Sequence, residues 1–213
     1  MGGKLVVQQG IIAGCAGGMY DNIAEAAAIL SGGDVGCGPF SLSVYPPSIP
    51  VNLELMQNGV QQALLEAGVL FKPCFCGPCF GAGDVPANNA LSVRHTTRNF
   101  PNREGSKPGD GQLSGVLLMD ARSIAATARN HGVVTSAAEV DYPAPAPVRR
   151  TFDGGVYGRR VYFGYGKARP ESPLHYGPNI AEWPAIPALG EELLLQVASV
   201  LRDPVTTTDE LIP

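Results

Sequence analysis

The sequence predicts an α/β fold, a three-layer αβα sandwich built around a mainly parallel sheet. Short runs rich in Val, Ile and Leu alternate with segments of helical spacing, and such alternation is typical of parallel sheets with crossover helices. Of the 213 residues, 45% are apolar and 16% charged, a globular composition. We expect this α/β domain to span residues 1–140, with an irregular extension over residues 141–213.

The first strand and helix are predicted in the first 33 residues. Leu5–Ile12 is rich in aliphatic side chains, as is typical of a strand that is buried on both faces. A helix then begins near Asp21, a capping residue type, and ends at Gly32-Gly33. Its apolar face comprises Ile23, Ala26, Ala27 and Leu30. Cys15 therefore follows a strand and precedes a helix.

The second strand is predicted at Phe40–Val44, and a helix follows it. Ser48 begins this helix with Pro50 in its first turn, and apolar positions continue at helical spacing as far as Ala67. We expect Met56 to be a core residue of this helix. After a stop at Gly68, a short strand is expected at Val69–Phe71, and it leads into the cysteine-rich loop.

Two further strands and a helix complete the predicted sheet domain. Leu91–His95 and Gly115–Met119 are strand-like, and the second is apolar enough to be buried. Asp120 is placed to cap the helix Ala121–Asn130, and Val133-Val134 is a candidate start for a last strand.

The composition changes near Tyr142, where prolines alternate with alanines. We expect a strand at Arg159–Tyr165 and a helix at Glu191–Leu201. Because this third of the chain has little apolar content of its own, we expect it to wrap the α/β domain or to serve as a linker toward a further C-terminal domain.

Composition also argues against several classes of partner. A net charge of −4 gives no reason to expect nucleic acid, and no apolar run reaches the roughly 18 residues of a membrane helix. A lipoprotein signal ending at Cys15 is disfavoured because Gln8-Gln9-Gly10 interrupts its apolar stretch. Five cysteines, an odd number, argue against a secreted disulfide framework and favour the cytoplasm.

Three of the cysteines, Cys74, Cys76 and Cys79, lie within six positions of a glycine- and proline-rich loop. A Cys-x-x-Cys pair brings two sulfurs within reach of one metal or one disulfide, and the spacing leaves both open. This loop and Cys15 each follow the end of a predicted strand. In open α/β sheets, ligands bind at that edge.

The segments Cys76-Gly77-Pro78-Cys79-Phe80-Gly81 and Thr97-Arg98-Asn99-Phe100-Pro101-Asn102-Arg103 resemble the iron–sulfur domain of the aconitase family. The resemblance runs in order from about Ile11 to Gly132. It implies a [4Fe–4S] cluster held by Cys15, Cys76 and Cys79 with one iron left open, and substrate carboxylates bound by Arg98 and Arg103. It further implies a hydratase or dehydratase of a small hydroxy di- or tricarboxylate.

The sequence departs from the family at two positions beside the implied cluster. Typical members have Cys-Thr-Asn where this chain has Cys15-Ala16-Gly17, and Asn where it has Thr97. Family members also carry upstream domains and a C-terminal domain that supplies an acid/base serine. We therefore expect this chain to be one domain of a larger parent, to contain no catalytic acid or base, and to be inactive when isolated.

Three other interpretations remain open. The chain is alternatively a non-catalytic binding or regulatory domain, or a zinc-stabilised module using Cys37, Cys74, Cys76 and Cys79. A thiol–disulfide oxidoreductase is disfavoured because Cys-Gly-Pro-Cys precedes a Gly-Ala-Gly loop and does not begin a helix. In the cluster interpretation, Cys74 is a bystander thiol.

Overall fold

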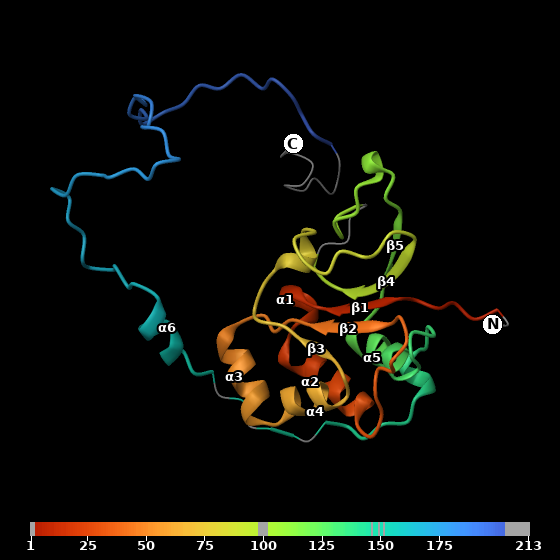
Figure 1. The fold of residues 1–213 in the computed structure, drawn as a ribbon. Helices are drawn as coiled ribbons and strands as arrows, with labels where there is room; N and C mark the ends of the chain where they lie inside the picture. Colours follow the sequence, from red (N-terminus) through yellow and green to blue (C-terminus); the bar gives the residue numbers. More distant parts are fainter. Residues whose placement is uncertain (1–2, 98–101, 146, 149, 151, 203–213) are drawn as a thin grey trace. The chain divides into compact units, whose positions relative to one another are not determined.

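Five parallel strands form one sheet in a computed structural model that describes residues 3–97, 102–145, 147, 148, 150 and 152–202 (Figure 1). The strand order is β3-β2-β1-β4-β5. The strands are β1 Gln9–Ile12, β2 Ser41–Val44, β3 Leu70–Phe71, β4 Ala90–His95 and β5 Ser114–Leu118. Every pairing within the sheet is parallel, which confirms the predicted α/β class.

Helices cover one face of this sheet, and long connections lie on the other (Figure 1). The helices are α1 Gly14–Gly17, α2 Tyr20–Leu30, α3 Ile49–Gln57, α4 Val60–Glu66, α5 Ala121–Arg129 and α6 Gly155–Arg160. Of these, α2 to α5 form the helical layer. The described connections between β3 and β4 and between β4 and β5 contain the 3-10 turns Gly77–Cys79 and Pro108–Asp110.

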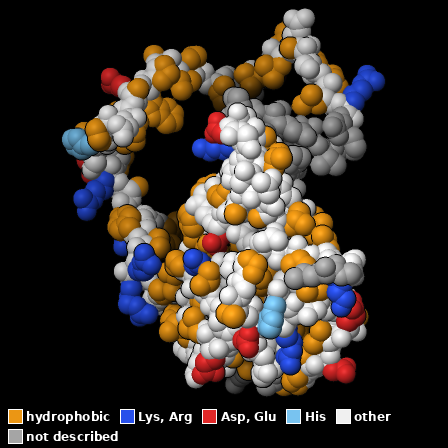
Figure 2. Space-filling view, turned by 45° about the vertical axis from the view of Figure 1, so that its right-hand side comes forward, with side chains coloured by type: hydrophobic (Ala, Val, Ile, Leu, Met, Phe, Trp, Pro, Cys, Tyr) orange, Lys and Arg blue, Asp and Glu red, His pale blue; other side chains and the backbone are white. Residues whose placement is uncertain are grey.

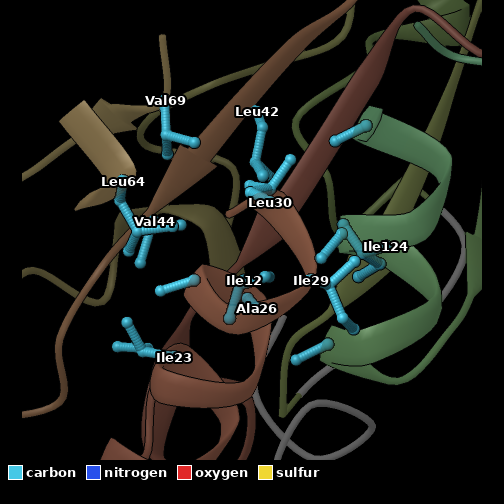
Figure 3. Packing of buried hydrophobic residues seen from close by; sticks show 14 of the residues in the cluster. Ile12, Ile23, Ala26, Ile29, Leu30, Leu42, Val44, Leu64, Val69 and Ile124 are labelled. Carbon is cyan, nitrogen blue, oxygen red and sulfur yellow. The ribbon is translucent and has the colours of Figure 1, made fainter. Parts of the chain in front are cut away.

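The main hydrophobic core lies between the sheet and the helical layer (Figure 3). Alternate residues of the central strands face it, as expected for a period of two. Gly10 lets α5 approach β1 closely, since a Cβ there would lie 3.1 Å from side chains of Ile124, Leu42 and Phe40. The predicted inward face of α2 is buried as expected.

The helical segment after Ser48 is two helices and not one. Ser48 caps α3 as predicted, its Oγ accepting from the Val51 amide at 3.5 Å. The break comes at Gly59, whose φ of 74° is left-handed and so interrupts the helix. The change of direction turns Met56 outward to 54% exposure, and Leu55 takes the core position. The prediction of Met56 as a core residue was therefore wrong.

Two predictions near α5 had opposite outcomes. Asp120 caps the helix as expected, its side chain accepting from the amides of Arg122 and Ser123. The strand β5 was predicted to be buried, but it lies at the edge of the sheet, and Leu118 is 66% exposed. Val133 makes one isolated antiparallel bridge, with Val6, in place of a last strand.

At the start of α2, Met19 occupies the cap position and Asp21 lies in the first turn. A carboxylate there still interacts favourably with the helix dipole. Asp21 also pairs with Arg150, whose guanidinium stacks over the Tyr20 ring at 4.7 Å. The beginning of the extension thus contacts the helical layer.

Contacts divide the chain into two units, residues 1–163 and 164–213. The predicted strand at Arg159–Tyr165 is wrong, because this segment contains the end of α6. The predicted helix at Glu191–Leu201 is not formed, and its described residues are exposed and irregular. Figure 2 shows hydrophobic side chains, in orange, exposed along an extended stretch of the chain. A short helix without a packed apolar face is marginal in water. The domain boundary at residue 140 remains a prediction.

Within the described residues, no helix has both the length and the apolar character that crossing a bilayer requires.

Candidate metal centre

The carboxyl ends of β1 and β4 form a topological switch point in the middle of the sheet. The chain leaves β1 toward β2 on one side, and β4 lies on the other side. Ligands of open α/β sheets bind at such a point. Cys15 lies in α1, directly after β1, and Thr97 follows β4. Cys74, Cys76 and Cys79 lie in the loop after β3, as the sequence predicted.

Cys15 is exposed and lies beside Thr97. Its Sγ is 3.1 Å from Thr97 Oγ1, which also accepts a hydrogen bond from the Ala16 amide at 3.3 Å. Because that amide occupies an acceptor position of the hydroxyl, the hydroxyl proton is available to the Cys15 sulfur. Thr97, which stands where the family has Asn, thus orients the first cysteine.

Cys15 and Cys76 line one cleft of about 220 Å³. The lining residues of this cysteine cleft are Gly14, Cys15, Pro46, Pro47, Cys74, Phe75 and Cys76. Cys79 lies beneath it, 1% exposed, and a Cβ on Gly14 would be 2.8 Å from the Cys79 sulfur. Gly14 has a φ of 76°, so both its conformation and its neighbour favour glycine. Cysteines from two separate turns therefore meet around Gly14.

A single metal ion and a cluster place different demands on cysteines. One zinc ion draws all of its sulfurs to about 2.3 Å from one point, whereas each cysteine of a [4Fe–4S] cluster binds a different iron. Among the described residues, no three His, Cys, Asp or Glu side chains form a group that could hold a metal ion.

The four-cysteine zinc site is not assembled in the described structure. Cys37 lies before β2, at the amino end of the strand, where it lines a different pocket with Asp34 and His131. The cysteine cleft is at the carboxyl ends of the strands. The zinc alternative therefore lacks one of its four proposed ligands.

Cys74 lies in the cysteine cleft, and burial raises the pKa of its thiol. Cys76-Gly77-Pro78-Cys79 forms a 3-10 turn. The helix N-terminus that activates a thioredoxin-type thiol is therefore missing from this described loop, which weakens the oxidoreductase alternative.

Of the two predicted substrate arginines, only Arg103 lies among the described residues. Arg98, together with Asn99, lies outside the described residues. Arg103 is half-buried in the loop after β4. The backbone of this loop contacts the cysteine loop, because a Cβ on Gly81 would lie 2.6 Å from Gly105 Cα and 3.3 Å from Arg103 O. The substrate-binding role of both arginines remains a prediction.

His95 belongs to the framework of the site. Its carbonyl oxygen accepts from the Ala13 amide at 3.0 Å, and a Cβ on Gly17 would lie 1.9 Å from the same oxygen. Its Nδ1 is buried and has no hydrogen-bond partner among the described residues. Burial lowers the pKa of His95, although Asp120 opposes the shift, so we assign it the neutral form at pH 7.

Sequence reasoning missed the polar network below the cysteine loop. Arg94 is 1% exposed and lies on the sheet face opposite the helical layer. We call Gln9, Tyr45, Asp84, Ser92 and Arg94, which are joined by hydrogen bonds, the Arg94 network. The available signal was a charged residue, Arg94, inside a segment that the sequence predicts as a strand.

Burial and charge act together in this region. Burial raises the pKa of Tyr45, and its hydrogen bond to Asp84 raises it further. Burial alone would raise the pKa of Glu104, but hydrogen bonds from Ser106 and Ser114 and the charge of Arg94 hold it below its usual value. Glu104 is therefore a carboxylate at neutral pH.

Comparison with known proteins identifies related sequences over the same region. The sequence profile of the aconitase family (aconitate hydratase) matches residues 2–126. The 3-isopropylmalate dehydratase large subunit of Nitratidesulfovibrio vulgaris (strain DP4) is 32% identical over 125 residues, which are 56% of this chain and 29% of that protein.

Two further relatives give the same result. The 3-isopropylmalate dehydratase large subunit 1 of Methanopyrus kandleri is 33% identical over 121 residues, 56% of this chain and 29% of the relative. Large subunit 2 of Pyrococcus furiosus is 34% identical over 113 residues, 51% of this chain and 28% of the relative. The chain spans less than a third of the length of these curated relatives.

Proposed function

The chain belongs to the aconitase family, and from this premise we propose that it is the iron–sulfur domain of a hydro-lyase acting on a small hydroxy di- or tricarboxylate. The observation that carries the proposal is the meeting of Cys15, Cys76 and Cys79 around Gly14. Residues 1–140 form this domain in our proposal, and residues 141–213 lead toward further parts of the parent protein.

Cys15, Cys76 and Cys79 would hold a [4Fe–4S] cluster as thiolates. When bound, the cluster supplies an iron without a cysteine ligand, a Lewis acid for the hydroxyl group of the substrate. Arg98 and Arg103 would bind substrate carboxylates through paired hydrogen bonds. Thr97 would donate its hydroxyl proton to the Cys15 thiolate, while its oxygen accepts from the Ala16 amide.

Elimination also needs a base that removes a proton from carbon. We propose that this group comes from another part of the parent, so the isolated chain binds a cluster without turning over substrate. Because the matched relatives are named large subunits, we propose a separate small subunit as a partner. The cytoplasm, where thiols stay reduced, is the proposed location.

One observation favours a second function, a binding or regulatory domain without chemistry. The position after Ala16 is Asn in typical family members, and here Gly17 packs against the His95 carbonyl with no room for a side chain. A polar group beside the cluster is thereby lost. In the full-length parent, a cluster that binds no hydroxy acid would select this second function.

Anaerobic reconstitution with iron and sulfide tests the primary proposal. We expect a brown protein with roughly four irons per chain. Cys76→Ser should abolish the visible absorption. Cys37→Ser should leave it unchanged, because Cys37 lies in a different pocket. A wild-type chain that remains colourless, or that takes up one zinc in place of iron, would contradict the proposal.

A further inference from the structure

Arg94 combines complete burial with a permanent charge. It is 1% exposed, in the interior strand β4, and points away from the helical layer. Its register partner in β1 is Ile11. A guanidinium stays protonated in proteins and loses much solvation on burial. Such a residue is retained in a core only where its hydrogen bonds are satisfied.

The guanidinium of Arg94 spans the sheet and the cysteine loop. On the loop side, it donates to the carbonyl oxygens of Pro78 at 3.1 Å and Asp84 at 2.8 Å. On the sheet side, it donates to Gln9 Oε1 at 3.0 Å and Ser92 Oγ at 2.9 Å. These four acceptors come from three segments of the chain, namely β1, the cysteine loop and β4 itself.

The two loop acceptors lie within and just after the turn that contains Cys76 and Cys79. Pro78 stands between Cys76 and Cys79, inside the 3-10 turn. Asp84 comes after that turn, and its backbone has a φ of 50°, an unusual conformation for a residue with a side chain. Asp84 receives three hydrogen bonds from the sheet face, from Arg94, Gln9 and Tyr45.

The two sheet acceptors connect the same guanidinium to β1, the strand that precedes Cys15, and to β4. Gln9 begins β1, and Ser92 of β4 donates to Gln9 Oε1 at 2.7 Å. Cys15 follows the end of β1 after three residues. The guanidinium is planar with donors in a fixed fork. Its contacts therefore set the height of the cysteine loop above β1 and β4.

We propose that Arg94 is a positioning residue that holds Cys76 and Cys79 at the distance from Cys15 that a cluster requires. This inference rests on the proposed function for its ligand, but the placement of the thiols is a property of the protein alone. The charge adds a second effect. Arg94 donates to the carbonyl oxygen of Pro78, the residue directly before Cys79, and a positive charge beside the loop would stabilise a thiolate-bound anionic cluster.

Two variants of the 213-residue chain separate geometry from charge. Arg94→Gln removes the fork and the charge, and Arg94→Lys keeps the charge on a single nitrogen. Arg129→Gln is the matched control, because Arg129 also donates to two backbone carbonyls, those of Ile29 and Ser31, but at the helical layer.

The first readout needs no cluster. In the reduced, metal-free chain, a short bifunctional thiol reagent should join Cys15 to Cys76, identified by mass spectrometry of the cross-linked peptides. Cys74→Ser in every chain removes the competing thiol of the cleft. We expect Arg94→Gln to lower the yield at least fivefold and Arg129→Gln to leave it unchanged. Equal yields in all three chains would overturn the positioning role.

The second readout is the reconstituted cluster. We expect Arg94→Gln to lose it at least tenfold faster under air than wild type. Arg94→Lys should lose it faster too, but should keep the cluster's reduction potential near that of wild type. A potential lowered equally in both variants would overturn the charge effect. If wild-type chain forms no cluster while the cross-linking differs as expected, the proposed function fails and the positioning role stands.

A milder substitution tests the same inference if Arg94→Gln does not fold. Ser92→Ala removes the acceptor of Arg94 Nε and leaves the arginine in place. We expect an intermediate cross-linking yield, lower than that of the folded wild-type chain and higher than that of the chain unfolded in denaturant. A yield equal to wild type in Ser92→Ala and Arg94→Lys together would count against the inference.

Discussion

The two faces of the same sheet are built on opposite principles. The face toward α2 to α5 presents aliphatic side chains such as Ile12, Leu42 and Val93, which are buried among helices. The opposite face presents the buried Ser92 and Arg94 and the half-buried Gln9, which are joined by hydrogen bonds beneath the cysteine loop. One face is held by contact area, and the other by directional bonds.

This difference has a physical consequence for function. Hydrophobic burial is non-directional, so it stabilises the layer without specifying sub-ångström positions. Buried polar groups are costly unless they are satisfied, so a hydrogen-bonded network admits few alternative arrangements. The candidate site lies on the side of the sheet with the polar network. The stability of the fold and the geometry of the cysteines therefore depend on different sets of residues.

Truncating the apolar face gives the largest expected effect on stability. Leu42→Ala removes a fully buried side chain and should lower the free energy of unfolding by about 3 kcal/mol. The thiols of the folded fraction should keep their cross-linking yield. Denaturant unfolding measures the first quantity. The exposed Leu65→Ala is the control, with an expected change within about 0.5 kcal/mol.

A substitution at the switch point should affect the cysteines strongly and the stability of the fold less. Gly17→Ala places a Cβ 1.9 Å from the His95 carbonyl oxygen, so α1 must move and displace Cys15. Such overpacking costs about 2 kcal/mol, less than Leu42→Ala, yet cluster formation should be lost. Gly38→Ala, which meets no atom within 4 Å, controls for added bulk. Normal cluster content in Gly17→Ala would contradict the claim that the site and the stability of the fold depend on different residues.

Tyr45→Phe tests the network by deleting one atom. Tyr45 donates to Asp84 Oδ2 at 2.7 Å, and loss of a bond to a carboxylate should cost about 1.5 kcal/mol. Because the pKa of Tyr45 is raised by burial and by Asp84, the stabilisation is present below the unfolded value of about 10 and falls as the pH rises above it. Unfolding curves of both proteins across that range should converge. If the difference in the free energy of unfolding between the two proteins stays constant with pH, ionisation of Tyr45 does not cause the loss of stability.

The smallest effect is expected at the cap of α5, on the helical side. Burial would raise the pKa of Asp120, but hydrogen bonds from Ser123 and Arg122 hold it below its usual value. Its stabilisation is therefore present above the unfolded pKa of about 3.9 and is lost as the pH falls through the lower folded value. Asp120→Ala should cost about 1 kcal/mol at pH 7.

Thermal unfolding from neutral to acidic pH checks the titration at this cap. The gap between wild type and Asp120→Ala should close in acid, and the cross-linking yield at Cys15 should stay the same at pH 7. A gap that persists at full protonation of the carboxyl group would mean that the cap acts through packing and not through charge.

Local signals predicted the elements but not their surroundings. The caps at Ser48 and Asp120 were readable because each acts on amides two or three residues away. Met56 and the strand β5 were misassigned because helical spacing continues across Gly59 and because an edge strand can be as apolar as a central one. Burial depends on neighbours, which a local pattern does not contain.

By itself, the sequence determined the α/β alternation, the family and the placement of Cys15 and the Cys76–Cys79 turn after strands. Spacing, capping and glycine conformation act over a few residues, so they can be recognised in the sequence alone. Only the tertiary structure decided that Cys37 lies away from the cysteine cleft and that Arg94 joins that loop to the sheet. Those facts depend on contacts between distant segments, such as Gln9 with Arg94 across 85 positions, which exist only once the strands have paired.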